Sequence, residues 1–212
     1  MTKEAVVCVH GLWVNGLDMS LLRSRLQEHY EVHQFTYNSV ASSPPENAAR
    51  LNEFAKAIEA EKVHFVAHSL GGIVVRHLYD SFPEQRPGRI VTLGSPHNGS
   101  HSAEQLHSFS LTRCLLGKST ETGLLGDLPE WRQVTDLGSI AGTLRFGMGI
   151  IIPGLEMPND GTVSVTETQL HGMTDHICLP LSHFGLLLSS QALEQIVNFL
   201  RDGKFHHKPS QE

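Results

Sequence analysis

The sequence predicts an α/β fold in which a mainly parallel sheet carries helices on both faces. Short runs of apolar and β-branched residues alternate with longer segments whose apolar residues recur at helical spacing. A strand followed by a helix must cross over before it pairs with the next strand, so such a chain builds parallel strands. The 212 residues suffice for one sizeable domain and two would be cramped, so we expect a single domain over residues 1–212.

The first half of the chain alternates strand and helix regularly. Runs of β-branched and apolar residues predict strands, which in order are Ala5–Val9, Val32–Tyr37, Val63–Ala67 and Arg89–Leu93. Apolar residues at helical spacing predict the helices between them, which are Met19–Tyr30, the segment after Pro44 and Pro45, and Leu70–Phe82. Prolines suit a helix start, because the first helical N–H groups have no partner within the helix.

The second half is less regular, and residues 100–158 predict an irregular cap or flap. The elements expected in this half are helices near Ser102–Leu116 and Leu128–Val134, strands at Gly138–Thr143 and Ile177–Leu181, and a final helix in "SSQALEQIVNFLRDG". Residues 144–158 are rich in glycine and aliphatic side chains and have no clean period. They form either a wall over something apolar or a loop packed in the core.

Composition excludes several classes of partner. A formal charge of −6 without a basic stripe argues against nucleic acid and against anionic membrane surfaces. No apolar run approaches the ~18 residues that span a bilayer, so we expect no stable membrane anchor. The start "MTKEAVVCVHG" lacks the pattern of a secretion signal, and three widely spaced cysteines indicate free thiols in a reducing compartment. These features predict a cytoplasmic location, and the oligomeric state stays open.

The fourteen histidines do not form a metal-binding pattern. They are scattered, and the sequence has no HExxH, no CxxC pair and no His-x-His cluster with acidic residues nearby. His206 and His207 stand together only in a polar C-terminal tail. We therefore expect neither a metal ion nor another cofactor.

A serine stands where the strand Val63–Ala67 must turn sharply into a helix, in "VAHSLGG". Such a turn crowds the two backbones, so the residues two before and two after the serine must be small, as Ala67 and Gly71 are. Ala67 departs from the usual Gly-x-Ser-x-Gly pattern but preserves smallness. The turn predicts that Ser69 is presented as a nucleophile, and an incidental turn serine is the alternative.

The first strand ends in "HGLWVNG", a loop that suits oxyanion binding. Acyl transfer needs two backbone N–H groups aimed at the oxyanion that develops during attack. We expect one from Leu70, which follows the nucleophile, and the other from Leu12. Gly11 would let the loop approach the substrate closely. His10 is expected to be a hydrogen-bonded core residue that braces the loop without taking part in proton transfer.

A serine nucleophile needs a base and a carboxylate that orients the base. "PNDGTVSV" places Asp160 in a turn, and "LPLSHFGLL" places His183 just past the last strand. Ser69, Asp160 and His183 then follow the chain order nucleophile, acid, base. Other candidates precede a strand or lie in the flap and are less favoured; they are His171, His176, Asp136, Asp175 and Glu156.

Together these motifs resemble the α/β-hydrolase superfamily, and within it the small bacterial lipases and carboxylesterases. "VHFVAHSLGGIVVRHL" and "SHFGLLLSSQALEQIVNFL" are similar to the minimal Bacillus-type lipases, which share the alanine of Ala-His-Ser-x-Gly. "TLGSPHNGS" and "NDGTVSV" resemble the longer Pseudomonas- and Burkholderia-type lipases and inositol deacylase relatives. The resemblance implies the α/β-hydrolase fold, with Ser69 as nucleophile, Asp160 as acid and His183 as base. It does not cover residues 100–158 or supply a counterpart of the calcium ligands of the longer lipases.

Three further residues are candidates for the substrate pocket. Trp13 in the oxyanion loop and Ile151 in the flap would supply apolar walls, and His97 of "GSPHNGS" follows a strand at the functional edge. For His97 and Asn98, the favoured alternative is that they pin a loop by hydrogen bonds.

The sequence thus predicts a serine hydrolase that cleaves a neutral acyl ester of short to medium chain through an acyl-enzyme. A thioesterase or acyltransferase on the same triad stays open. An alternative from another class is a ligand-binding protein that keeps the fold and turns over slowly. A dehydrogenase is excluded, because no GxGxxG follows the first strand.

Overall fold

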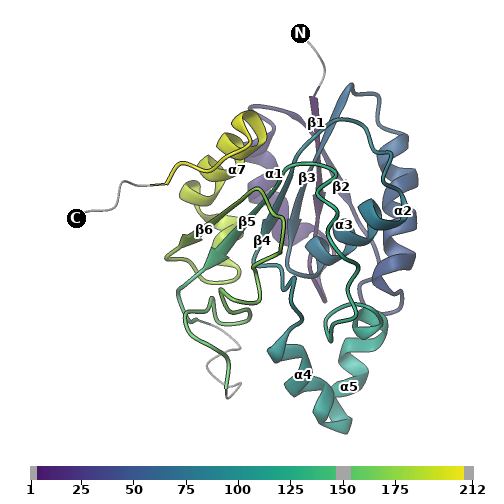
Figure 1. Ribbon diagram of the computed structural model, residues 1–212, viewed down its shortest axis with the longest axis vertical. Helices are drawn as coiled ribbons and strands as arrows, with labels where there is room; N and C mark the ends of the chain where they lie inside the picture. The colour runs from purple at the N-terminus through teal and green to yellow at the C-terminus, as the bar shows by residue number, and fades with distance from the viewer. Residues whose placement is uncertain (1–3, 147–153, 208–212) are drawn as a thin grey trace, which may run out of the picture.

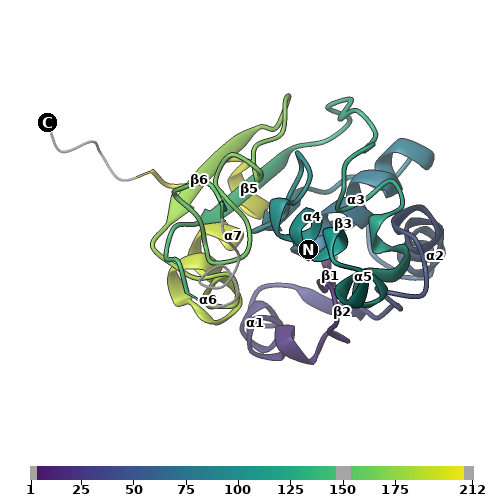
Figure 2. The same ribbon diagram turned by 90° about the horizontal axis from the view of Figure 1, so that it is seen from below.

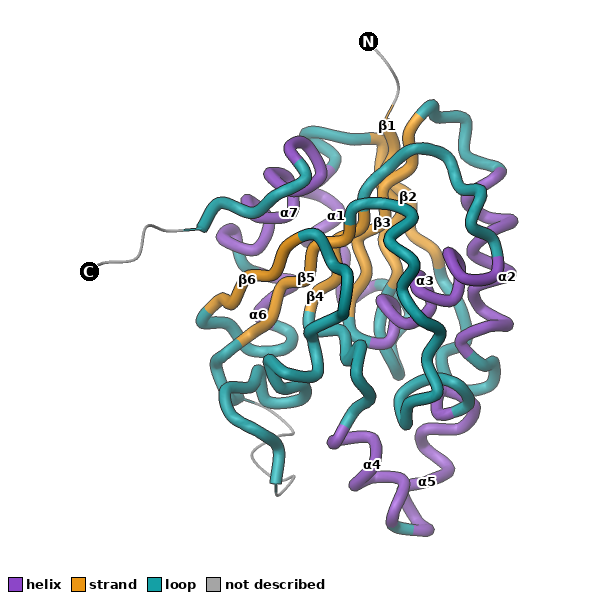
Figure 3. Tube along the Cα trace, viewed as in Figure 1, coloured by secondary structure: helices purple, strands orange, loops and turns teal. Residues whose placement is uncertain are grey.

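The computed structural model describes residues 4–146 and 154–207, and its centre is a six-stranded sheet in the order β2-β1-β3-β4-β5-β6. Every neighbouring pair of strands is parallel. The strands are β1 Glu4–Val9, β2 Glu31–Phe35, β3 Lys62–His68, β4 Ile90–Leu93, β5 Leu137–Gly142 and β6 Asp175–Leu179. The predicted fold class, a parallel sheet covered on both faces, is confirmed (Figures 1 and 3).

Helices cover both faces of the sheet, and those of residues 101–116 lie beyond its carboxyl edge (Figure 1). The helices are α1 Ser20–Leu26, α2 Pro44–Lys56, α3 Leu70–Ser81, α4 His101–Ser108, α5 Ser110–Leu116, α6 Gly185–Leu188 and α7 Ser190–Asp202, with 3-10 turns η1 Leu17–Met19 and η2 Gly117–Thr120. Successive residues of β1 point to opposite faces, so Val7 packs in the cluster that contains α2 and α3, and Val6 packs in the cluster that contains α1 and α7. None of the helices in the described residues is long and apolar enough to span a bilayer.

The strand order places a crevice at the carboxyl edge of the sheet. β1 pairs with β2 on one side and with β3 on the other, so the chain changes direction across the sheet at this point. The connections that leave β1 and β3 lead to helices on opposite faces of the sheet, and ligands of open α/β sheets bind outside the strand ends at such a position. This edge lies at the bottom of Figure 1, next to α4 and α5, and Figure 2 views it from below.

Local signals account for the boundaries of the longer helices. α2 begins with a capping box, in which Ser43 Oγ accepts the N–H of Glu46 and the Glu46 carboxylate accepts the N–H of Ser43. α7 begins at the cap residue Ser189 and ends at Gly203, whose φ of 73° suits a residue without a side chain.

The sequence predictions were wrong in detail in the cap. The helix expected near Ser102–Leu116 is two helices, because Phe109 between α4 and α5 has an extended backbone. The segment Leu128–Val134 is not helical. Asp127, just before the segment, and Gln133, within it, have positive φ. The ring of Trp131 is buried and lies edge-on to Tyr79.

Two other elements are shifted or shortened. The helix expected at Met19–Tyr30 is the turn η1 followed by α1, which ends at Leu26. The last strand runs over Asp175–Leu179 and ends before Pro180, which has no N–H to donate to a neighbouring strand.

Candidate active site

Ser69 occupies the sharp turn between β3 and α3. Its φ of 54° and ψ of −123° are strained for a residue with a side chain, and close packing around it holds this conformation. A Cβ added to Gly71 would lie 2.3 Å from the carbonyl oxygen of Val9, and one added to Gly72 would collide with a neighbouring side chain. Only glycine fits at these two positions, so α3 can start directly against the sheet and expose Ser69 at its edge.

Asp160 and His183 form a buried pair. His183 Nδ1 lies 2.7 Å from Asp160 Oδ2, and the aspartate side chain is fully buried. The other carboxylate oxygen accepts the backbone N–H groups of Thr162 and Val163 at 2.8 and 2.7 Å. The carboxylate therefore cannot rotate freely, and it keeps the His183 proton on Nδ1 so that Nε2 is the basic nitrogen.

Two glycines make room for this pair. A Cβ on Gly94, which follows β4, would lie 2.8 Å from Asp160 Oδ2 and 3.0 Å from His183 Nδ1. A Cβ on Gly142, at the end of β5, would lie 2.6 Å from the Asp160 Cβ. Sequence reasoning missed both residues, because neither stands in a motif that signals contact with the pair.

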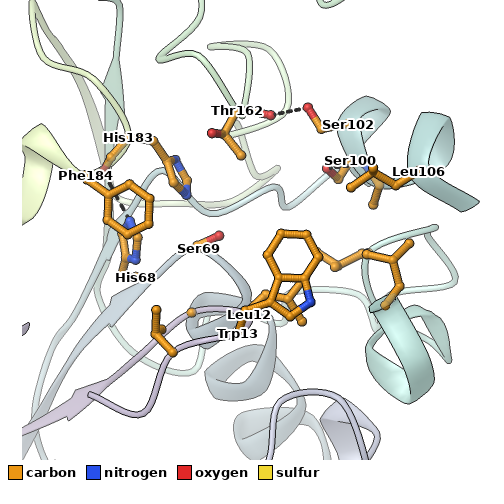
Figure 4. A pocket seen from close by; sticks show the side chains of 15 residues that line it. Leu12, Trp13, His68, Ser69, Ser100, Ser102, Leu106, Thr162, His183 and Phe184 are labelled. Atoms are coloured by element: carbon orange, nitrogen blue, oxygen red, sulfur yellow. Dashed lines mark hydrogen bonds between the residues drawn. The ribbon is translucent and has the colours of Figure 1, made fainter. Parts of the chain in front are cut away.

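The Ser69 hydroxyl and the His183 ring face the same cavity (Figure 4). Within the described residues no hydrogen bond joins the two side chains, and catalytic contacts of this kind often tighten only when substrate binds. The structure thus brings together the three residues expected from the sequence. They come from the loop after β3, the connection between β5 and β6, and the loop after β6.

His68, the residue before Ser69, supports His183 and was also missed. Its Nε2–H donates to the His183 carbonyl oxygen at 3.2 Å, and the two rings lie 4.6 Å apart. Burial holds the pKa of His68 well below its ordinary value, so the ring stays neutral. The signal that could have identified His68 from the sequence is its position directly before the nucleophile.

His10 orients the peptide that joins Gly11 to Leu12. The buried ring donates from Nδ1 to the Gly11 carbonyl oxygen at 2.8 Å, and its Nε2 accepts the N–H of Tyr37 at 3.3 Å. Burial lowers the pKa of His10, which favours this neutral tautomer. Because the C=O and N–H of a trans peptide point in opposite directions, the N–H of Leu12 points away from His10.

The other expected oxyanion donor is the N–H of Leu70. Leu70 is the first residue of α3, so its N–H has no acceptor within the helix and lies at the positive end of the helix dipole. Gly11 and Ser69 come close, since a Cβ on Gly11 would lie 3.0 Å from the Ser69 Cβ. The loop after β1 therefore meets the nucleophile at short range.

A cavity lies beside Ser69, and the empty space between its lining residues, together with open solvent at the mouth, is about 570 Å³. Most of its wall is apolar, and the apolar residues that line it are Leu12, Trp13, Val14, Ala103, Leu106, Leu116, Leu124 and Phe184. Ser100, Ser102 and Thr162 add a polar strip, in which Ser102 Oγ donates to the Thr162 carbonyl oxygen at 2.6 Å.

The three pocket candidates from the sequence have different outcomes. Trp13 lines the cavity, whereas Ile151 lies outside the described residues. His97 does not line the cavity: it is 1% exposed, its Nε2 lies 3.1 Å from Thr92 Oγ1, and its carbonyl oxygen accepts Arg76 Nη1. Burial lowers the pKa of His97 to about 3. The expectation of substrate contact is corrected in favour of the alternative, a residue that pins the loop.

Much of the flap expected to form an apolar wall, residues 147–153, lies outside the described residues. None of the described residues of 144–158 lines the cavity, and α4, α5 and Leu124 supply apolar wall there.

The described residues contain no group of three or more His, Cys, Asp or Glu side chains arranged to hold a metal ion.

Comparison with known proteins supports the fold and gives the family. No curated protein matches the sequence. Among solved structures, Bacillus licheniformis lipase BlEst2 in its mature form is similar with a TM-score of 0.75 and 21% identity, over 93% of this chain and 91% of that one. The type II thioesterase BorB from the borrelidin biosynthetic cluster is similar with a TM-score of 0.66 and 16% identity, over 94% of this chain and 92% of that one.

The metagenomic carboxyl esterase MGS0156 gives a TM-score of 0.63 and 18% identity, over 86% of this chain and 65% of that one. At these identities the similarity establishes the α/β-hydrolase fold and nothing finer. A family model described as "Domain of unknown function (DUF7379)" matches residues 6–174. Since this match covers most of the sequence, the chain belongs to the DUF7379 family.

Proposed function

We propose that this protein is a serine hydrolase that cleaves carboxylic esters through Ser69, His183 and Asp160. The observation that carries the proposal is the buried Asp160–His183 pair, with 2.7 Å between Oδ2 and Nδ1, beside the strained turn that presents Ser69. A fully buried carboxylate that accepts two backbone N–H groups and a ring N–H is arranged to orient a base.

The proposed reaction runs through an acyl-enzyme. His183 Nε2 takes the proton of Ser69 as Oγ attacks the acyl carbon, and the N–H groups of Leu12 and Leu70 bind the oxyanion. His183 then protonates the leaving alcohol as the ester C–O bond breaks. Next, His183 removes a proton from a water molecule that attacks the acyl carbon, and it returns that proton to Ser69 when the acid leaves.

The cavity favours a neutral acyl ester of short to medium chain as substrate. Its wall is largely aliphatic, and neither arginine nor lysine lines it among the described residues, so no side chain there would pair with an anionic headgroup. Thioester hydrolysis is a second candidate on the same triad, and the similarity to the thioesterase BorB supports it.

The test is hydrolysis of p-nitrophenyl esters from acetyl to palmitoyl, and of matched acyl thioesters, by the native protein and by Ser69→Ala. We expect ester cleavage with a maximum at short to medium chains, and its loss in the variant. A higher kcat/KM for thioesters would make the second candidate the function. Absence of hydrolysis, together with no labelling of Ser69 by a fluorophosphonate, would overturn the proposal in favour of a ligand-binding protein.

A further inference from the structure

The side chains of both proposed oxyanion donors belong to one apolar cluster with the cap. Leu70 and Ile73 of α3 form this cluster with Ala103, Leu116 and Leu124, and the half-buried Leu12 packs against it. Ala103, Leu116 and Leu124 also line the cavity. The backbone N–H groups proposed to bind the oxyanion and the wall proposed to hold the acyl chain therefore share one packed unit.

Trp13 makes a second link between the same two parts. Its φ of 62° is an outlier for a bulky residue, so the loop needs restraints to keep this conformation. Its backbone N–H donates to the buried Ser39 Oγ at 3.0 Å. Its indole Nε1–H donates at 2.7 Å to the carbonyl oxygen of Leu115, in the last turn of α5, where carbonyl groups have no partner within the helix.

The indole also borders the cavity, as Figure 4 shows. The residue Trp13 is 44% exposed, so neighbouring protein atoms do not cover it on all sides. An acyl chain that fills the cavity would pack against the ring and against Leu116, the residue that follows its hydrogen-bond acceptor. Such a chain would bury the exposed apolar surface and hold Trp13 against α5.

We propose that Trp13 is a positioning residue that couples occupation of the acyl pocket to the alignment of the Leu12 N–H. This inference rests on the proposed function and adds a substrate preference to it. An ester whose acyl chain reaches the cap is cleaved with a higher kcat, in addition to any lower KM. Binding energy from the unreactive part of the substrate is then used to order the oxyanion loop in the transition state.

The experiment measures kcat and KM separately for p-nitrophenyl acetate, butanoate, hexanoate and octanoate, in the native protein and in Trp13→Phe. Phenylalanine keeps an aromatic wall and removes the indole N–H. In the native protein we expect kcat to rise about tenfold from acetate to octanoate, within the range that one oxyanion donor controls. In Trp13→Phe, kcat should vary less than about twofold across the series, while KM still falls as the chain lengthens.

The control is Leu111→Ala, which changes an exposed residue of α5 and should keep the native dependence of kcat on chain length. A Trp13→Phe variant with the native dependence would overturn the inference, as would a native kcat that does not change with chain length. Neither result would affect the proposed function, which fails separately if Ser69→Ala still hydrolyses the esters. A far-UV circular dichroism spectrum like the native one would exclude unfolding as the cause of a low kcat.

Discussion

The carboxyl edge of the sheet and the cap border the same cavity, but they are held in different ways. At the edge, Asp160 is fully buried, accepts three hydrogen bonds and fits only because Gly94 and Gly142 lack side chains. In the cap, Leu111 is 87% exposed and Phe109 is 64% exposed. We therefore expect substitutions at the edge to disturb the chemistry and substitutions on the exposed part of the cap to be tolerated.

The largest expected effect tests the rigid side of this comparison. Asp160→Asn keeps the shape of the side chain but turns an amide N–H toward His183 Nδ1, which forces the wrong ring tautomer. We expect kcat for ester hydrolysis to fall by about 10⁴-fold, with the thermal unfolding midpoint changed far less. Asp175→Asn, at the opposite end of β6, is the matched control and should keep native activity. A loss of less than about tenfold in Asp160→Asn would mean that Asp160 does not orient the base.

Acid should destabilise the sheet scaffold, because it contains buried neutral histidines. Burial lowers the pKa of His10, His68 and His97, the last to about 3. Below the ordinary pKa of 6.5, these side chains take up protons more readily in the unfolded chain than in the folded one. The contribution of these histidines to the free energy of unfolding should therefore have its full value above pH 6.5. It should fall as the pH drops, by up to about 1.4 kcal/mol per pH unit for each group.

Urea unfolding between pH 7.5 and 5 measures this dependence. The urea concentration at the midpoint should fall steadily below pH 6.5. In His97→Gln, the slope of this midpoint against pH should be smaller, because one titrating group has been removed. A midpoint that stays constant down to pH 5 would show that these histidines are not held neutral by the fold.

The same contrast explains what could be predicted from the sequence. Ser69 and His183 each stand in a short motif just after a strand, and parallel strands bring such ends to one edge. Asp160 stands in a turn motif between β5 and β6, and the chain order nucleophile, acid, base identified it. Local pattern and topology were therefore enough to expect their meeting. Gly94 and Gly142 could not be singled out, because their importance depends on what lies opposite them in space.

The cap was predicted less well, because tertiary contacts override its local pattern. Apolar spacing favoured one helix across Phe109, yet the two halves turn so that Leu116 can join α3 in the apolar cluster. The segment around Trp131 has a helix-like spacing, but burial of its ring beside Tyr79 and the bond from Arg76 Nε to the Pro129 carbonyl oxygen hold it irregular. The sequence of this segment alone does not identify Tyr79 or Arg76 as its partners.

A smaller effect is expected where the rigid edge meets the oxyanion loop. The imidazole ring of His10 stacks on Tyr37, with 4.2 Å between the ring centroids. His10→Phe puts another aromatic ring in this place, but that ring cannot donate to the Gly11 carbonyl oxygen. We expect kcat to fall about 10- to 100-fold with KM nearly unchanged, because the Leu12 N–H is no longer held in place. His10→Asn, whose amide can reproduce the Nδ1 donor, should lose less activity although it loses the stacking. If the two variants lose activity equally, the hydrogen bond does not set the orientation of the loop.

The smallest effect should come from the cap and should change preference without affecting the chemistry. Leu106 on α4 lines the cavity and is only half-buried, so a larger side chain can replace it without overpacking the core. In Leu106→Trp we expect kcat/KM for the octanoyl ester to fall about three- to tenfold, because the indole occupies acyl space, while the acetyl ester changes less than twofold. Leu111→Trp, on the solvent side of α5, is the control of equal size and should leave both values native. An equal loss for both esters in Leu106→Trp would mean that the cap also holds the triad in place, and the division between a rigid catalytic edge and a tolerant cap would then be wrong.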